Sequence, residues 1–117
     1  MCGIIGYCGN GTAPRHVVHG LTKLEYRGYD SAGIALVTPQ GLEIHKGTGR
    51  IRDIDDHLGL TSLEADTALG HTRWASHGGP TSDKAHPHKD SSGTIAVGHN
   101  GIVENYEDLR TELLREG

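Results

Sequence analysis

The chain opens with Met1-Cys2-Gly3-Ile4-Ile5-Gly6, a cysteine followed by a short apolar run, and this stretch decides how the remainder is interpreted. Small residues behind an initiator methionine usually permit its removal, which would leave Cys2 as the first residue. That residue would then carry a thiol nucleophile and a free α-amine, a group that titrates near neutral pH. N-terminal threonine enzymes combine a nucleophile and a base in this way. The alternative is that position 2 simply holds a small residue.

Length and composition limit the classes of protein that the chain can belong to. Its 117 residues form one domain at most. The net charge of −4 and the lack of a basic run argue against a nucleic-acid-binding surface. No segment reaches the roughly 18 apolar residues of a membrane span, and no charged stretch followed by an apolar one suggests a signal peptide. A cytoplasmic protein that contacts neither nucleic acid nor membrane is therefore expected.

The apolar pattern predicts the secondary structure. Strands are expected at residues 3–7, 33–37, 42–46, 67–74 and 94–99, and helices at 12–25, 50–58 and 105–116. The second and third strands form a hairpin, and Thr12 is a candidate cap of the first helix. A long polar loop, rich in Gly, Pro, Ser and His, is expected from Ser76 to Gly93 and is suited to function.

These elements predict an α+β fold in which a sheet packs against helices. The last helix ends at the final residue, with no strand after it, so we expect the chain to be truncated relative to a larger folded unit. The two cysteines, Cys2 and Cys8, would lie roughly 20 Å apart along a strand, too far for a disulfide. Cys8 is expected to be a small buried side chain.

Two polar stretches follow predicted strands, where loops often carry function. In His71–Gly78, Arg73 offers a fork of donors suited to a carboxylate, and Ser76 and His77 can add hydrogen bonds. The alternative is a surface Arg73 beside a Trp74 that anchors the core. In His99-Asn100-Gly101, the Asn100 amide and the Gly101 N–H can stabilise an oxyanion, although Asn-Gly is also a common turn.

Two further features of the sequence, its many histidines and the stretch Leu24–Gly33, cannot be assigned a catalytic or binding role from residue type. The nine histidines suggest a metal site, but the tight ligand pairs that are typical of zinc sites are absent. We therefore expect no metal, and His86 and His88 are expected to order their loop by hydrogen bonding. The stretch Leu24–Gly33 mixes aromatic, charged and glycine residues, and its composition alone gives it no role.

Taken together, these stretches resemble one family, the N-terminal-nucleophile (class II) glutamine amidotransferases. Cys2-Gly3-Ile4-Ile5-Gly6 resembles the start of that family. His71–Gly78 and His99-Asn100-Gly101 resemble its glutamine-binding and oxyanion motifs. The stretch Leu24–Gly33 resembles the glutamine:fructose-6-phosphate aminotransferase (glucosamine-6-phosphate synthase) branch, and the amidophosphoribosyltransferases differ there. The resemblance implies an αββα sandwich and a reaction that needs no cofactor.

The resemblance also implies roles for individual residues. Cys2 would attack the side-chain amide of L-glutamine, with its own α-amine moving protons. Asn100 and the N–H of Gly101 would stabilise the oxyanion. Arg73 would hold the glutamine α-carboxylate, supported by the two residues Ser76 and His77. Trp74 would line the exit for ammonia, and Tyr29 would pack near the closing loop.

The resemblance further implies that residues 1–117 are the N-terminal portion of a glutaminase domain. The sugar-isomerase domains, which would use the ammonia to convert fructose 6-phosphate to glucosamine 6-phosphate, are absent from the chain, and the full-length protein would be a homodimer. The family's acidic residue for the glutamine α-amine lies beyond Gly117. The alternatives left open are another class II amidotransferase, such as the amidophosphoribosyltransferase branch, and a non-catalytic module that binds glutamine.

Overall fold

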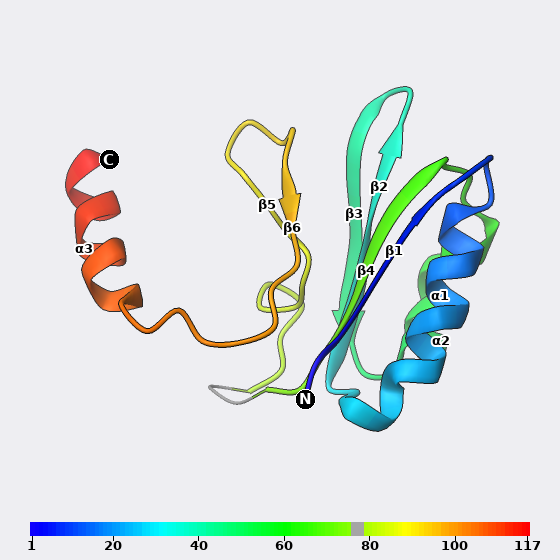
Figure 1. Cartoon of the computed structure of the whole chain (residues 1–117), viewed down its shortest axis with the longest axis horizontal. Coiled ribbons are helices and arrows are strands. Elements are labelled where there is room, and N and C mark those ends of the chain that lie inside the picture. The colour runs from blue at the N-terminus through cyan, green and yellow to red at the C-terminus, as the bar shows by residue number, and fades with distance from the viewer. Residues whose placement is uncertain (76–78) are drawn as a thin grey trace.

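A computed structural model describes residues 1–75 and 79–117, which form a layered α+β structure (Figure 1). The central layer is a four-stranded antiparallel sheet in the order β1-β4-β2-β3. Its strands are β1 (Gly3–Cys8), β2 (Ser31–Thr38), β3 (Gly41–Thr48) and β4 (Thr67–Arg73). The helices α1 (Ala13–Leu24) and α2 (Ile51–Leu58) cover one face, and two short 3₁₀ turns at Glu25–Arg27 and Leu60–Ser62 complete this half.

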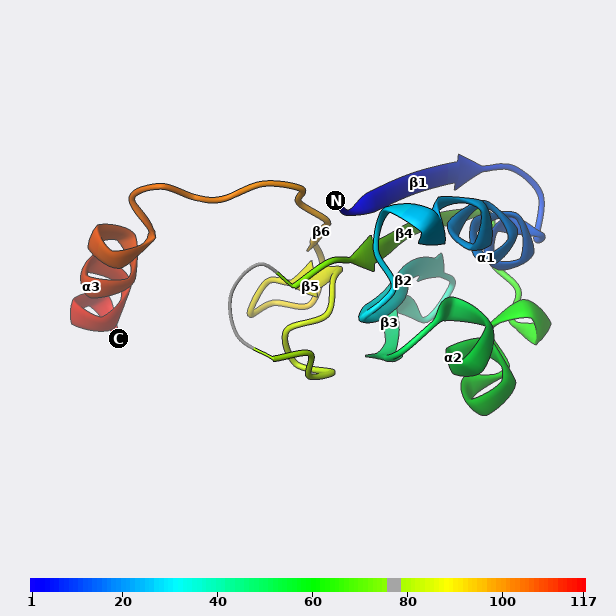
Figure 2. The same ribbon diagram turned by 90° about the horizontal axis from the view of Figure 1, so that it is seen from below.

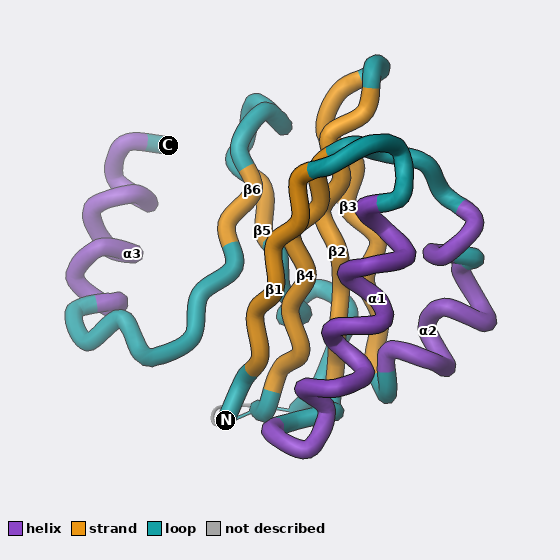
Figure 3. The backbone as a smooth tube through the Cα atoms, turned by 45° about the vertical axis from the view of Figure 1, so that its right-hand side comes forward, coloured by secondary structure: helices purple, strands orange, loops and turns teal. Residues whose placement is uncertain are grey.

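A second, smaller layer faces the other side of the sheet (Figure 2). It is a two-stranded antiparallel sheet of β5 (His88–Lys89) and β6 (Ala96–Val97). The final helix, α3 (Tyr106–Glu116), stands away from both sheets in every view (Figure 3). Helix, sheet and second sheet are therefore stacked in the order in which an αββα sandwich begins.

The core lies between the four-stranded sheet and α1. Val17 and Leu21 of α1 recur at helical spacing and are fully buried against Ile34 and Leu36 of β2. Burying each Leu or Ile side chain contributes about 1.5–3 kcal/mol. Ile51 of α2 is buried in the same cluster. The hairpin and the two helices predicted from the sequence in this half are confirmed.

The strand β1 lies at the edge of the sheet, and this position corrects one prediction. Its residues alternate, with Gly3 buried toward α1 and Ile4 40% exposed. Both cysteines are free thiols, and Cys8 is exposed. The prediction that Cys8 is buried is wrong, because it ends an edge strand on the face opposite α1.

The remaining elements agree with the prediction in kind but differ in extent. The strand predicted over residues 94–99 is confined to the two residues of β6, because its partner β5 is equally short. The sequence analysis did not predict β5. Thr12 precedes α1, but its side chain makes no capping hydrogen bond. The apolar residues of α3 are exposed. Among the described residues, none of the helices has the length and apolar character needed to span a bilayer.

Candidate active site

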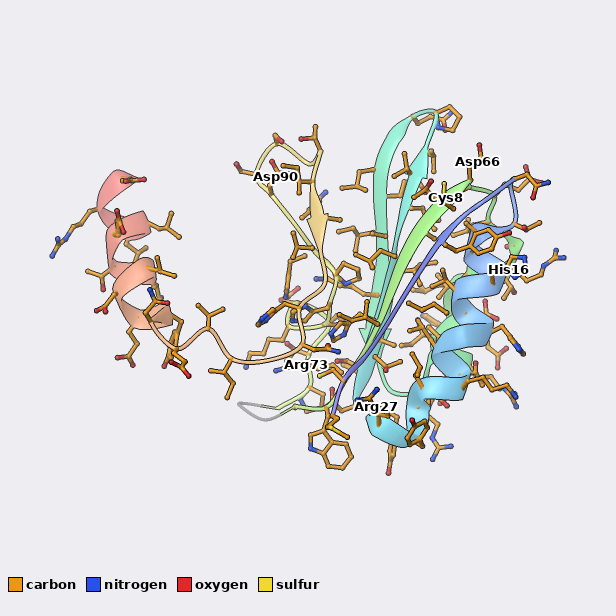
Figure 4. The ribbon with its side chains drawn as sticks, in the orientation of Figure 1. Cys8, His16, Arg27, Asp66, Arg73 and Asp90 are labelled. Atoms are coloured by element: carbon orange, nitrogen blue, oxygen red, sulfur yellow. The ribbon has the colours of Figure 1, made fainter. Side chains whose placement is uncertain are left out.

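The start of β1 places Cys2 beside the end of β4. The two strands are antiparallel, with Gly3 opposite Thr72, so the residues before β1 meet those after β4. The backbone N–H of Trp74 donates to Cys2 Sγ at 3.4 Å. Trp74 is 55% exposed, so it is no core anchor. Arg73 lies at this end of the sheet, whereas Cys8 lies at the opposite end (Figure 4).

Asn100 reaches Cys2 from the segment after β6. Its side-chain Nδ2 donates to the backbone oxygen of Cys2 at 3.2 Å. Its Oδ1 lies 2.8 Å from Nε2 of His71. Gly101 has a φ of +131°, where a side chain is strained, and a Cβ there would lie 3.4 Å from the His99 ring. The backbone bends at Gly101, and Asn100 is directed at Cys2 by its contacts.

One cavity of about 830 Å³ joins these groups. Its lining residues come from just before β1, the end of β4, the stretch that leads into β5, the segment after β6 and the first residue of α3: Cys2, His71, Arg73, Trp74, His86, His88, His99, Gly101, Ile102, Val103 and Tyr106. The structure thus brings together the predicted residues Cys2, Arg73, Trp74 and Gly101, with Asn100 adjacent. The predicted residues Ser76 and His77 lie outside the described residues.

Asp30 supports the segment after β4, and the sequence interpretation missed it. Its carboxylate accepts hydrogen bonds from the backbone N–H of Ala75 and from the Ser31 hydroxyl. Its own N–H donates to the backbone oxygen of Arg73 at 3.2 Å. The Asp30 and Ala75 positions are 45 residues apart, so only the unusual mixture of residues in 24–33 hinted at this role.

Other members of the same stretch connect the site to α2. Glu25 Oε1 accepts a hydrogen bond from the N–H of Ile51 at 2.8 Å, at the N-terminus of α2, where a carboxylate is favourable. Tyr29 packs edge-on against Trp74 with ring centres 6.4 Å apart. The guanidinium of Arg50 lies 4.8 Å from the Tyr29 ring. The stretch therefore joins Trp74 to the helical layer.

Three of the residues that line the cavity, His71, His86 and His88, form a cluster of rings. The rings of His71 and His86 are stacked with centres 4.5 Å apart, and His88 packs edge-on against His86 at 4.5 Å. Burial, with smaller effects from neighbouring positive groups, lowers the pKa of His86 to about 4. Burial likewise lowers the pKa of His71 and of His88. In the described part of the chain, no group of three or more His, Cys, Asp or Glu residues is arranged to hold a metal ion.

Comparison with solved structures defines the fold class. No protein-family model matches the chain. The glutamine phosphoribosylpyrophosphate amidotransferase of B. subtilis matches 100% of the chain with a TM-score of 0.83 and 28% identity, over 25% of its own length. A structure titled the allosteric regulatory enzyme of purine biosynthesis matches with a TM-score of 0.85 and 30% identity, over 26% of its length. The predicted N-terminal-nucleophile, class II glutamine amidotransferase fold is confirmed.

Comparison of sequences is more specific. Over its whole length the chain is 50% identical to the glutamine–fructose-6-phosphate aminotransferase (isomerizing) of Thermococcus kodakarensis, 51% to that of Aquifex aeolicus and 52% to that of Streptomyces coelicolor. The predicted resemblance to this branch is therefore confirmed. The chain spans only 19–20% of the length of these relatives.

Proposed function

We propose that this chain carries the glutaminase chemistry of a glutamine–fructose-6-phosphate aminotransferase, the hydrolysis of L-glutamine to glutamate and ammonia. The observation that supports it most directly is that Cys2 and Arg73 line one cavity, while the Asn100 amide donates to the Cys2 backbone oxygen beside it. These are a nucleophile, an oxyanion donor and a carboxylate-binding cation. They come from segments that are far apart in the sequence.

The reaction begins once Met1 has been removed. Met1 is 75% exposed, and its Sδ accepts a 3.8 Å contact from Arg27. The thiol proton of Cys2 passes to its own α-amine, and Sγ attacks the amide carbon of glutamine. The C–N bond then breaks, and the leaving nitrogen takes the proton from the α-ammonium to depart as ammonia. Water attacks the resulting thioester, which releases glutamate and restores the thiol.

Asn100 and Gly101 supply the oxyanion donors in this proposal. The Asn100 amide has two N–H donors; one donates to the Cys2 carbonyl, and the other serves the tetrahedral intermediate, together with the Gly101 N–H. Removal of one such donor typically costs about 10²–10³ in kcat. The Trp74 N–H fixes the direction of the Cys2 sulfur.

The remaining predicted residues bind the substrate. Arg73 pairs with the α-carboxylate of glutamine, and Ser76 and His77 add hydrogen bonds. The exposed Trp74 indole borders the path by which ammonia leaves. In the whole protein, ammonia is transferred to fructose 6-phosphate to form glucosamine 6-phosphate. We propose residues 1–117 as the N-terminal portion of the glutaminase domain of a cytoplasmic homodimer.

The first test is the intact mass of the protein before and after treatment with 6-diazo-5-oxo-norleucine, a glutamine-like electrophile. We expect Met1 to be absent and a single adduct to map to Cys2. Cys8→Ser is the matched control, since Cys8 lies at the far end of the sheet (Figure 4), and it should leave labelling unchanged. Retained Met1, or labelling shared equally with Cys8, would contradict the proposal.

The acceptor needs its own test, because the solved neighbours act in a different branch. The whole protein is assayed with glutamine plus either fructose 6-phosphate or phosphoribosyl pyrophosphate. The 50–52% identity to the aminotransferases, against 28–30% to the amidotransferase structures, favours fructose 6-phosphate. Transfer to phosphoribosyl pyrophosphate alone would overturn the assignment of the branch. Glutamine binding without glutamate release would indicate a non-catalytic module.

A further inference from the structure

His71 occupies a position from which it can control Asn100. It lies in the middle of β4, between Ile4 of β1 and Gly33 of β2, and it is fully buried. Its Nε2 lies 2.8 Å from Asn100 Oδ1 and 3.3 Å from the backbone oxygen of His99. Both partners are acceptors, so Nε2 must carry the hydrogen. A buried, rigid donor is thus directed at the segment that holds Asn100.

This donor determines which way the Asn100 amide faces. With Oδ1 accepting from His71, Nδ2 is turned toward the Cys2 carbonyl, 3.2 Å away. Residues 99–117 are all exposed, so burial does little to hold this side chain in place. The two hydrogen bonds therefore set the amide orientation, and the one made by the buried ring sets it against the rigid sheet.

His86 holds the same segment from the other side. Its ring stacks on His71, and its Nδ1 accepts a hydrogen bond from the backbone N–H of His99 at 3.3 Å. One residue, His99, thus has its N–H bound by His86 and its C=O bound by His71. We refer to His71 and His86 as the histidine pair. The acceptor role requires a neutral His86, in keeping with its lowered pKa.

The histidine pair is in turn fixed to the sheet. Nζ of Lys46, on β3, donates to the backbone oxygens of Ala85 at 2.8 Å and Pro87 at 3.4 Å, on either side of His86. The backbone of His86 also passes so close to β2 that a Cβ on Gly33 would lie 2.5 Å from its oxygen. The position of His86 is therefore determined by β2 and β3.

From these contacts we infer that His71 and His86 are positioning residues, which act through Asn100 by holding its amide and the His99 peptide in the geometry that the oxyanion requires. This inference rests on the proposed glutaminase function and adds to it two residues that do not touch the reacting atoms. It predicts that their effect on catalysis depends on Asn100.

A double-mutant cycle on glutamate release by the whole protein tests this dependence. His71→Leu removes the donor, and His71→Gln keeps an N–H near the position of Nε2. We expect His71→Leu to lower kcat about 10–100-fold, less than complete loss of an oxyanion donor, with KM for glutamine within about threefold. His71→Gln should recover most of kcat. On an Asn100→Ala background, His71→Leu should lower kcat less than about twofold further.

The matched control is His16→Leu, because His16 also stacks on an aromatic ring, Tyr7 at 4.4 Å, but at the far end of the sheet (Figure 4). It should leave kcat unchanged. If His71→Leu fails to fold, the pair His86→Leu and His86→Asn gives the same test, since only Asn keeps an acceptor for the His99 N–H.

The outcomes separate the inference from the function on which it rests. If His71→Leu lowers kcat by the same factor with and without Asn100, or leaves it unchanged while Cys2→Ala abolishes glutamate release, the positioning role is overturned and the glutaminase function stands. If Cys2→Ala retains full activity, both are overturned. Equal activity of His71→Gln and His71→Leu would also count against a donor role.

Discussion

The two halves of this chain are ordered by different forces. Up to Arg73, apolar side chains such as Val17, Leu21 and Ile34 are fully buried between sheet and helix. Beyond that point, Ala85 and Pro87 are the buried apolar residues among those described, polar contacts from Lys46 and His71 hold the segments with His86 and Asn100, and residues 99–117 are exposed. The candidate site lies where the halves meet. Apolar packing therefore fixes the Cys2 side, and hydrogen bonds fix the Asn100 side.

The largest effect should come from the packed half. Leu21→Ala removes a fully buried side chain and should lower the free energy of unfolding by about 2–5 kcal/mol. Leu113→Ala is the control on α3, where the leucine is 65% exposed, and should change it by less than about 0.5 kcal/mol. Urea unfolding of the 117-residue chain measures both. Equal losses would show that α3 packs as tightly as α1, and the contrast would disappear.

The next effect concerns the contact between the halves. In Gly33→Ala, the new Cβ would lie 2.5 Å from the His86 oxygen and 2.5 Å from Lys46 Cβ, so the loop must move. We expect a loss of about 1–3 kcal/mol in thermal unfolding. Gly6→Ala is the control, because the nearest atom to its Cβ would be 4.0 Å away. A neutral Gly33→Ala would mean that the loop is not held against β2.

A smaller effect is expected from Asp30→Asn. A neutral amide accepts from the Ala75 N–H and Ser31 hydroxyl more weakly than a carboxylate, at a cost of about 1 kcal/mol. Because Asp30 supports the segment with Arg73, KM for glutamine should rise severalfold. Asp66→Asn, which weakens a comparable 2.6 Å bond from the Gly11 N–H at the far end of the sheet, should leave KM unchanged. If Asp30→Asn and Asp66→Asn changed KM equally, Asp30 would have no specific role in supporting the site.

The smallest effect is a pH dependence of stability. Burial, followed by the positive charges of His71, His88, Arg73 and His99, lowers the pKa of His86 from 6.5 to about 4. As pH falls from 6.5 toward 4, His86 binds a proton in the unfolded chain but stays neutral in the folded chain, so the free energy of unfolding decreases. Above pH 6.5, His86 is neutral in both states and the free energy of unfolding has its full value. Solvent screening keeps the effect under about 1 kcal/mol. His86→Asn should flatten this decrease in urea titrations, and an unchanged slope would contradict the assignment.

Much of the packed half could be predicted from the sequence, because its signals are local. The spacing of Val17 and Leu21 predicts α1, and the apolar run before Pro39 predicts β2 and its hairpin. The exposure of the Cys8 side chain could not be predicted, since the sequence does not indicate which strand lies at the edge of the sheet. The short β5 was missed because its pairing with β6 has no local signal.

The motifs of the candidate site could be recognised in the sequence, but the residues that hold them in place could not. The residue types in three stretches, those with Cys2, Arg73 and Asn100, indicate the chemistry that each could perform. His71 was noted only as a member of its stretch, and Asp30 only as part of an unexplained one. Their roles depend on contacts with residues 29 and 45 positions away, which only the fold brings together. Hydrogen bonds of this range leave no periodic pattern in a sequence.

Trp74 has a consequence for how the site can be observed. It is the sole tryptophan among the 117 residues, its indole is 55% exposed beside Cys2, and its ring touches Tyr29 edge-on. In this chain, intrinsic fluorescence excited at the red edge therefore originates beside Cys2 and nowhere else. Under the proposed function, binding of glutamine, acylation of the Cys2 thiol and release of glutamate are each expected to change this emission, without a label.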